Sequence, residues 1–146
     1  KSNNMQTLQL RPFELSDMQT AILPETEMTA TISHNKRPLI VVQHNCLGHV
    51  EAPEGCRLMA NLLDQFVELE ALPTAVILQG RGVDLATADN PAQAALLRYI
   101  TLSVPVLICE KSVEILQTVC QLEGSQLVDQ REIAKQMIIN PDIIWL

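Results

Sequence analysis

Three short apolar runs, each about as long as a β-strand, are separated by stretches that mix apolar and polar residues. The runs are 38–43 (PLIVVQ), 74–79 (TAVILQ) and 104–109 (VPVLIC). None of them alternates between apolar and polar positions, which is typical of strands buried on both faces of a parallel sheet. We therefore predict a strand in each run, a short extended piece at 126–128 and a last strand at 142–146.

Between these runs, apolar residues recur at helical spacing. The pattern predicts helices over 54–71, 91–102, 111–122 and 130–139, and Asn90-Pro91 is a typical start for the second of them. The residues expected to face the core are Leu58, Leu62, Phe66 and Leu69 with Met59 and Leu63 beside them, then Leu96, Leu97 and Ile100, then Val113, Leu116 and Cys120, and finally Ile133, Ala134, Met137 and Ile138.

This alternation of strands and helices with short links predicts an α/β fold. A parallel sheet needs helical crossovers that cover both of its faces. We expect a three-layer sandwich with a mostly parallel sheet of four or five strands over residues 38–146. Residues 1–37 lack a clear period, so we predict an N-terminal arm or linker with one short helix near 14–22.

Composition narrows the classes of protein and of partner. With 146 residues the chain is about one domain long, and a hydrophobic share of 47% excludes a disordered chain. The net charge of −7 and the absence of a basic run predict no nucleic-acid partner. No apolar stretch reaches the roughly 18 residues of a membrane span, and KSNNMQTLQL lacks a signal-peptide core. We expect a cytoplasmic protein that does not enter the membrane.

The four cysteines are Cys46, Cys56, Cys109 and Cys120. They form no CxxC motif and no paired metal-ligand spacing, so we predict no metal site, no cofactor and no disulfide framework. Cys120 falls on the apolar face of a predicted helix and is assigned to the core. Cys56 lies in the first turns of another helix and is assigned to packing.

Ligands of open α/β sheets bind outside the carboxyl ends of the strands, and Cys109 ends a strand there. A thiol at a helix N-terminus has a lowered pKa; Lys111 would lower it further, and Glu110 opposes this effect. A thiolate at this place can accept and pass on sulfur by thiol exchange. The alternative is a buried cysteine that packs as a small hydrophobic residue.

Two other segments follow strands at the same predicted edge. Cys46 shares a loop with His44 and His49, and a histidine can act as a base for a thiol, although an ordinary polar loop has the same composition. Arg81 can hold an anion or remain solvated. The glycines around it are too few for a phosphate-binding loop and are more typical of turn geometry.

Four stretches after residue 37 match one family in order and spacing: LGHVEAPEG at 47–55, ALPTAVILQGRGVDL at 71–85, VPVLICEKSVEIL at 104–116 and GSQLVDQREIAKQMIINPDIIWL at 124–146. They resemble the DsrE/DsrF-like family. The similarity is greatest to the C-terminal DsrE-like domain of sulfurtransferase-like selenium metabolism proteins of the YedF type. Residues 1–37 do not match the TusA-like domain that precedes it in those proteins.

The resemblance implies sulfur-relay chemistry. Cys109 matches the cysteine that carries a persulfide, and Cys46, His49, Arg81 and Ser112 would line its pocket. The YedF branch has a second cysteine where this chain has Ser112, which places a two-thiol mechanism in question. The resemblance also implies a homo-oligomer and a sulfur-donor or sulfur-acceptor protein as partner.

Three hypotheses follow. The first is a DsrE-like, sulfurtransferase-related persulfide carrier that uses Cys109. The second is a divergent non-catalytic DsrE-like module for binding or oligomerisation, and it predicts a buried, unreactive Cys109. The third is a small-ligand pocket beside residues 80–90 without covalent chemistry.

Overall fold

The structure is a computed structural model, and it describes residues 37–146. The short helix expected near 14–22 lies outside these residues. The compact unit that contains them spans Asn35–Leu146. In chain order its elements are β1 (Leu39–Val42), α4 (Glu54–Glu68), β2 (Ala75–Leu78), the 3₁₀ helix η1 (Gly80–Ala86), α5 (Ala92–Thr101), β3 (Val106–Cys109), α6 (Glu110–Leu116), β4 (Gln126–Val128), α7 (Gln130–Ile139) and β5 (Ile143–Trp145).

All five strands form one parallel sheet in the order β4-β3-β2-β1-β5. Every residue of β1, β2 and β3 is buried, which explains why these strands read as continuous apolar runs. The edge strands β4 and β5 are three residues long and partly exposed. The predicted α/β architecture with a mostly parallel sheet of four or five strands is confirmed.

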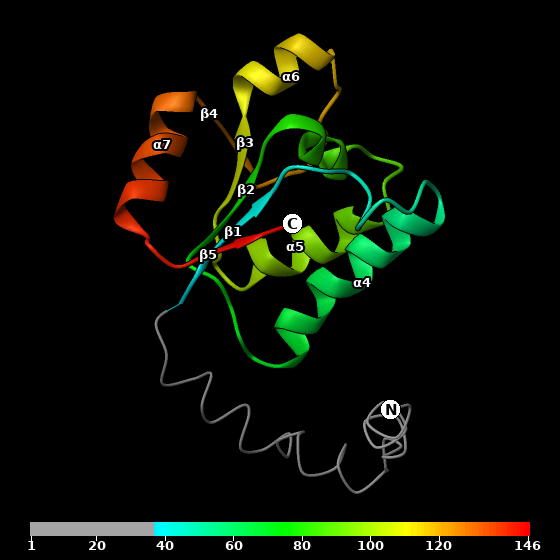
Figure 1. Cartoon of the computed structure of the whole chain (residues 1–146), viewed down its shortest axis with the longest axis horizontal. Coiled ribbons are helices and arrows are strands. Elements are labelled where there is room, and N and C mark those ends of the chain that lie inside the picture. The colour runs from blue at the N-terminus through cyan, green and yellow to red at the C-terminus, as the bar shows by residue number, and fades with distance from the viewer. Residues whose placement is uncertain (1–36) are drawn as a thin grey trace, which may run out of the picture. The chain divides into compact units, whose positions relative to one another are not determined.

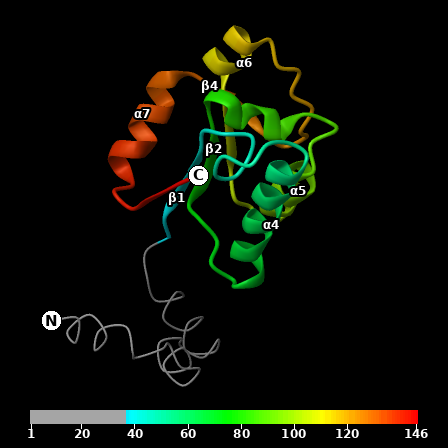
Figure 2. The same cartoon turned by 45° about the vertical axis from the view of Figure 1, so that its right-hand side comes forward.

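The helices cover both faces of the sheet (Figure 1). Helices α4 and α5 lie together against one face and α7 lies against the other, an arrangement that the turned view repeats (Figure 2). The strand side chains alternate accordingly: Ile40 and Val42 of β1 pack toward α4 and α5, whereas Leu39 and Val41 pack toward α7. Helix α6 lies beyond the carboxyl end of β3 (Figure 1). No helix within residues 37–146 is long and apolar enough to cross a bilayer.

The buried faces of α4, α5 and α7 differ from the prediction, and in α5 the expected core residue Leu97 is 41% exposed. In α4 the fully buried side chains are Met59 and Leu63, whereas Leu58 is exposed. In α7 Ile133 and Met137 pack on the sheet, and Ile138 is 81% exposed. All three sequences place apolar residues next to one another, so the apolar arc is wider than the buried face and its centre is ambiguous.

The helix predicted over 111–122 ends early, at Leu116. Gln117 adopts a left-handed conformation (φ 53°), which stops the helix. The chain beyond it attaches to η1 instead, because the Gln121 N–H donates to the Ala86 carbonyl at 2.9 Å. Cys120 is therefore outside any helix, where its thiol donates to the Val83 carbonyl at 3.6 Å and packs against the core.

The segment after β2, predicted as a loop, contains the 3₁₀ helix η1. A Cβ on Gly82 would lie 2.0 Å from the Val42 carbonyl oxygen, so only glycine lets η1 approach the end of β1 this closely.

Two adjacent leucines of α5 test this packing. Leu96 is fully buried, and we expect Leu96→Ala to lower the free energy of unfolding by about 2–5 kcal/mol through a cavity in the core. Leu97 is 41% exposed, so Leu97→Ala is the control and should stay within about 0.5 kcal/mol. Urea denaturation followed by circular dichroism measures both. Equal losses would contradict the orientation of α5.

Candidate functional site

Polar contacts gather where η1, the loop after β1 and the segment that follows α6 meet, at the carboxyl edge of the sheet. Asp84 is central to them: its carboxylate accepts hydrogen bonds from Asn45 Nδ2 at 2.9 Å and from Thr118 Oγ1 at 3.3 Å. Arg81 Nη1 lies 3.6 Å from the same carboxylate. Asp84 thus joins three segments that are distant in the sequence, and it was not among the residues that sequence reasoning selected.

Cys109 lies at the end of β3 and at the N-cap of α6, as its sequence position suggested. The Ser112 N–H donates to its sulfur at 3.4 Å. Its side chain belongs to the cluster on the α7 face, with Ile133 and Val128 among its members, and it is only 1% exposed. In this conformation solvent and a sulfur donor do not reach the thiol.

The other predicted site residues lie at the same edge but do not surround Cys109. Within residues 37–146, no hydrogen bond or ion pair joins Cys46, His49 or Arg81 to Cys109. Ser112 alone contacts it, through the backbone N–H, while its hydroxyl accepts the Gly80 N–H at 2.9 Å. Arg81 is exposed and pairs with Asp84.

Cys46 and His49 belong to a different cavity, of about 510 Å³, formed by the loop after β1. Cys46 is half-buried and the two histidines of the loop are exposed. The cavity is lined by His44, Asn45, Cys46, Gly48, His49, Val50, Glu51 and Ala52. It combines a thiol that solvent can reach with two imidazoles that can take up a proton.

Cys56, which sequence reasoning assigned to packing alone, contacts Cys46: the two Sγ atoms are 3.4 Å apart. The contact depends on the preceding residue, because a Cβ on Gly55 would lie 1.8 Å from the Val50 carbonyl oxygen and 2.7 Å from the Cβ of Cys46. Glycine at this position allows the loop to pack on the first turn of α4. A separation of ten residues across a loop carries no spacing signal, so the sequence did not reveal this pair.

Burial, followed by the hydrogen bond to Cys46 and the negative charges of Cys46 and Asp84, raises the pKa of the Cys56 thiol to about 11. Burial also raises the pKa of Cys120, with Asp84 as a second cause. Both thiols are therefore protonated near neutral pH, and the Asp84 carboxylate opposes their ionisation.

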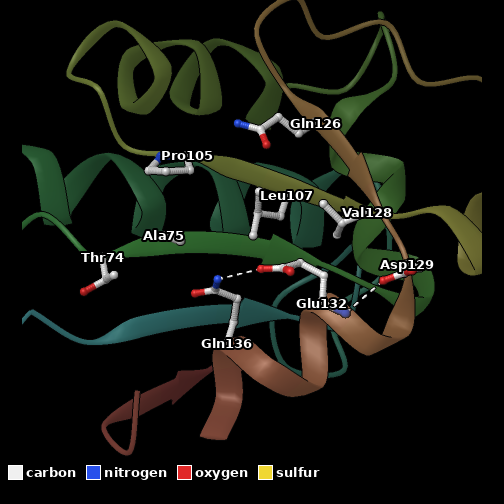
Figure 3. A pocket seen from close by; sticks show the side chains of 9 residues that line it. All are labelled: Thr74, Ala75, Pro105, Leu107, Gln126, Val128, Asp129, Glu132 and Gln136. Atoms are coloured by element: carbon white, nitrogen blue, oxygen red, sulfur yellow. Dashed lines mark hydrogen bonds between the residues drawn. The ribbon is translucent and has the colours of Figure 1, made fainter. Parts of the chain in front are cut away.

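A second cavity, of about 570 Å³, lies between α7 and the sheet (Figure 3). It is lined by Thr74, Ala75, Pro105, Leu107, Gln126, Val128, Asp129, Glu132 and Gln136. Its carboxylates already have partners: Asp129 caps α7 by accepting the Glu132 N–H, and Glu132 accepts a hydrogen bond from Gln136 (Figure 3). No cysteine lines this cavity, so a sulfur-transfer step cannot use a thiol there.

Comparisons with known proteins reveal similarity in structure only. No protein-family profile and no curated protein sequence matches the chain. The ychN protein from E. coli is similar in structure, with a TM-score of 0.57 at 14% identity, over 75% of this chain and 99% of that one. The protein of unknown function MTH1491 from Methanobacterium thermoautotrophicum has a TM-score of 0.52 at 13% identity, over 77% of this chain and 100% of its own. Similarity to solved structures at such low sequence identity establishes the shared fold alone.

The negative charge of Asp84 raises the pKa of the Cys56 and Cys120 thiols, which a charge-neutral variant can test. We expect Asp84→Asn to lower the pKa of Cys56 and of Cys120, because it removes a negative charge that disfavours the thiolate. Alkylation by iodoacetamide at pH 9, resolved by site with mass spectrometry, should become about two- to fivefold faster at both. Asp89→Asn in the same segment is the control and should change neither rate. Unchanged rates in Asp84→Asn would contradict the electrostatic role.

Proposed function

We propose that this chain, whose fold is the DsrE/DsrF-like fold, is a sulfurtransferase-related protein that carries persulfide sulfur on a cysteine at the carboxyl edge of its sheet. The expected fold is confirmed, whereas the particular closeness to the YedF type and a role in selenium metabolism stay predictions. One observation supports the proposal above the others: Cys46 is half-buried in the wall of a cavity that also holds His44 and His49.

The chemistry needs only a thiol, a base and a persulfide donor. The Cys46 thiolate attacks the outer sulfur of a donor persulfide, a new S–S bond forms on Cys46, and the donor leaves as a thiolate. An imidazole of the loop takes the proton of Cys46 before attack, as in other activated nucleophiles. Transfer onward is the same exchange with an acceptor thiol.

The resemblance assigns this role to Cys109. Because Cys109 is buried, it could carry sulfur only if the structure opened around it. The residue is only 1% exposed and packs in the cluster that contains Ile133 of α7, so sulfur transfer at Cys109 requires α6 or α7 to move away first. Helix α6 has seven residues and none of them is fully buried. Cys46 needs no such opening, and for this reason we place the sulfur on Cys46.

The second candidate is a non-catalytic DsrE-like module that assembles into a homo-oligomer. The burial of Cys109 favours it, and so does Ser112, which stands where a second thiol would be and accepts the Gly80 N–H through its hydroxyl. The sheet edges carry apolar side chains in the open, with Leu127 of β4 58% exposed and Trp145 of β5 53% exposed. Such edges are natural places for copies to associate.

Sulfur loading distinguishes the two candidates. After incubation with glutathione persulfide, we expect the full chain to gain one sulfur atom in intact mass, at Cys46 by peptide mapping. Cys46→Ser should abolish the gain, because it removes the reachable thiol. Cys120→Ser is the control and should load like wild type, since that thiol is partly buried and hydrogen-bonded.

Cys109→Ser decides between the two thiols. Loading that survives in Cys109→Ser but not in Cys46→Ser supports Cys46. The reverse pattern returns the role to Cys109, and no loading of the wild type leaves the non-catalytic module.

The non-catalytic candidate predicts that the protein is a homo-oligomer in solution, which sedimentation can measure. If β4 joins copies, the wild type should sediment as a homo-oligomer, and Leu127→Lys should shift it toward the monomer by placing a charge on the edge strand. Leu102→Lys is a matched control, because Leu102 is also exposed but follows α5 away from the sheet edge. A wild type that sediments as a monomer would contradict this candidate.

A further inference from the structure

We infer that Cys46 and Cys56 form a reversible thiol–disulfide couple that takes low-molecular-weight disulfides as its oxidant and fastens the loop after β1 to α4. The observation is the contact of the two sulfur atoms at 3.4 Å, between two half-buried residues beside an open cavity. A disulfide needs an S–S distance of about 2.05 Å, so the atoms must approach by only about 1.4 Å.

The backbone around the pair is already fixed, which makes this approach a matter of side-chain rotation. The Leu47 N–H donates to the Gly55 carbonyl at 3.0 Å, and the Gly55 N–H donates to the Glu51 carbonyl at 2.7 Å. The first bond attaches the residue after Cys46 to the residue before Cys56, and the second attaches Gly55 to the loop itself. The loop therefore does not need to refold for the bond to form.

The other two cysteines lack such a neighbour. Cys109 is buried under α7, and Cys120 donates to the Val83 carbonyl. In the described part of the chain, Cys46 and Cys56 are the one pair of sulfur atoms in contact. Residues 37–146 contain no group of three or more His, Cys, Asp or Glu side chains that could hold a metal ion.

The reaction balances as two successive exchanges. The Cys46 thiolate attacks one sulfur of the external disulfide, a mixed disulfide forms on Cys46, and one external thiolate leaves. The Cys56 thiolate then attacks the Cys46 sulfur, the Cys46–Cys56 bond forms, and the second external thiolate leaves. The two cysteines lose two electrons to the external disulfide, and their two protons pass to the released thiolates. Excess external thiol reverses both steps.

The order of attack follows from the surroundings of the two thiols. Cys46 lines the cavity through which a small disulfide arrives, whereas Cys56 lies in the first turn of α4 behind it. The high pKa of Cys56, caused first by burial, keeps this thiol protonated near neutral pH, so Cys46 is the thiol that attacks first. Once formed, the bond removes the Cys46 thiol from the cavity wall, so the oxidised form can accept no sulfur there.

Oxidation with glutathione disulfide tests the couple on the full chain. After trapping of free thiols by alkylation, we expect the wild type to lose two alkylatable thiols and to yield a Cys46–Cys56 cross-linked peptide. Neither Cys46→Ser nor Cys56→Ser should yield the cross-linked peptide, because each variant lacks one of the two sulfur atoms. Cys120→Ser is the matched control and should cross-link like wild type. In the native chain the cross-link should form at least about tenfold faster than in urea, because the fold holds the two sulfurs together.

The outcomes separate this inference from the proposed function, because oxidation is measured without any persulfide. The couple would be overturned if the wild type formed glutathione adducts but no cross-link. It would also be overturned if the cross-link formed at equal rates in native and urea-unfolded chains. Gly55→Ala adds a second test that keeps all four thiols: its Cβ would displace the loop and should slow cross-linking. A cross-link without sulfur loading would reject the proposed function alone, and loading without a cross-link would reject the couple alone.

Discussion

The complete burial of the three central strands is the constraint on which the rest of the structure depends. Because β1, β2 and β3 offer no exposed position, the sheet itself has no place for polar chemistry. Reactive groups that solvent reaches therefore lie outside these strands, in the segments that follow them. Backbone segments pack closely in this region, and at Gly55 and Gly82 a Cβ would collide with a backbone oxygen. Asp84 then joins these segments by hydrogen bonds.

The sequence predicts the architecture well because apolar runs of strand length carry a direct physical signal. The three central strands follow from those runs, and the parallel sheet follows from their alternation with helical segments. The faces of α4, α5 and α7 were misplaced in part, since neighbouring apolar residues make the helical stripe too wide to locate its centre. The end of α6 was also missed, because Gln117 shows no sign in its residue type of a left-handed conformation.

The candidate site was less predictable than the fold, and Cys109 shows why. Its place at a strand end and helix start was correctly derived from the sequence. Whether its thiol is reachable depends on which face of the sheet it points to and on where α7 packs, and both are tertiary properties. The contact of Cys46 with Cys56 is tertiary too, since a loop of ten residues can close in many ways. Sequence reasoning finds the edge where chemistry collects, but not which thiol is available there.

One consequence of the Asp84 carboxylate concerns damage by hydroperoxides. These oxidants attack thiolates and drive cysteines irreversibly to sulfinic and sulfonic acids. Since burial and the nearby negative charge keep Cys56 and Cys120 protonated, and Cys109 is enclosed by aliphatic side chains, three of the four cysteines are shielded from this chemistry. The arrangement concentrates vulnerability on Cys46, where a neighbouring thiol can intercept the first oxidation product before it is lost.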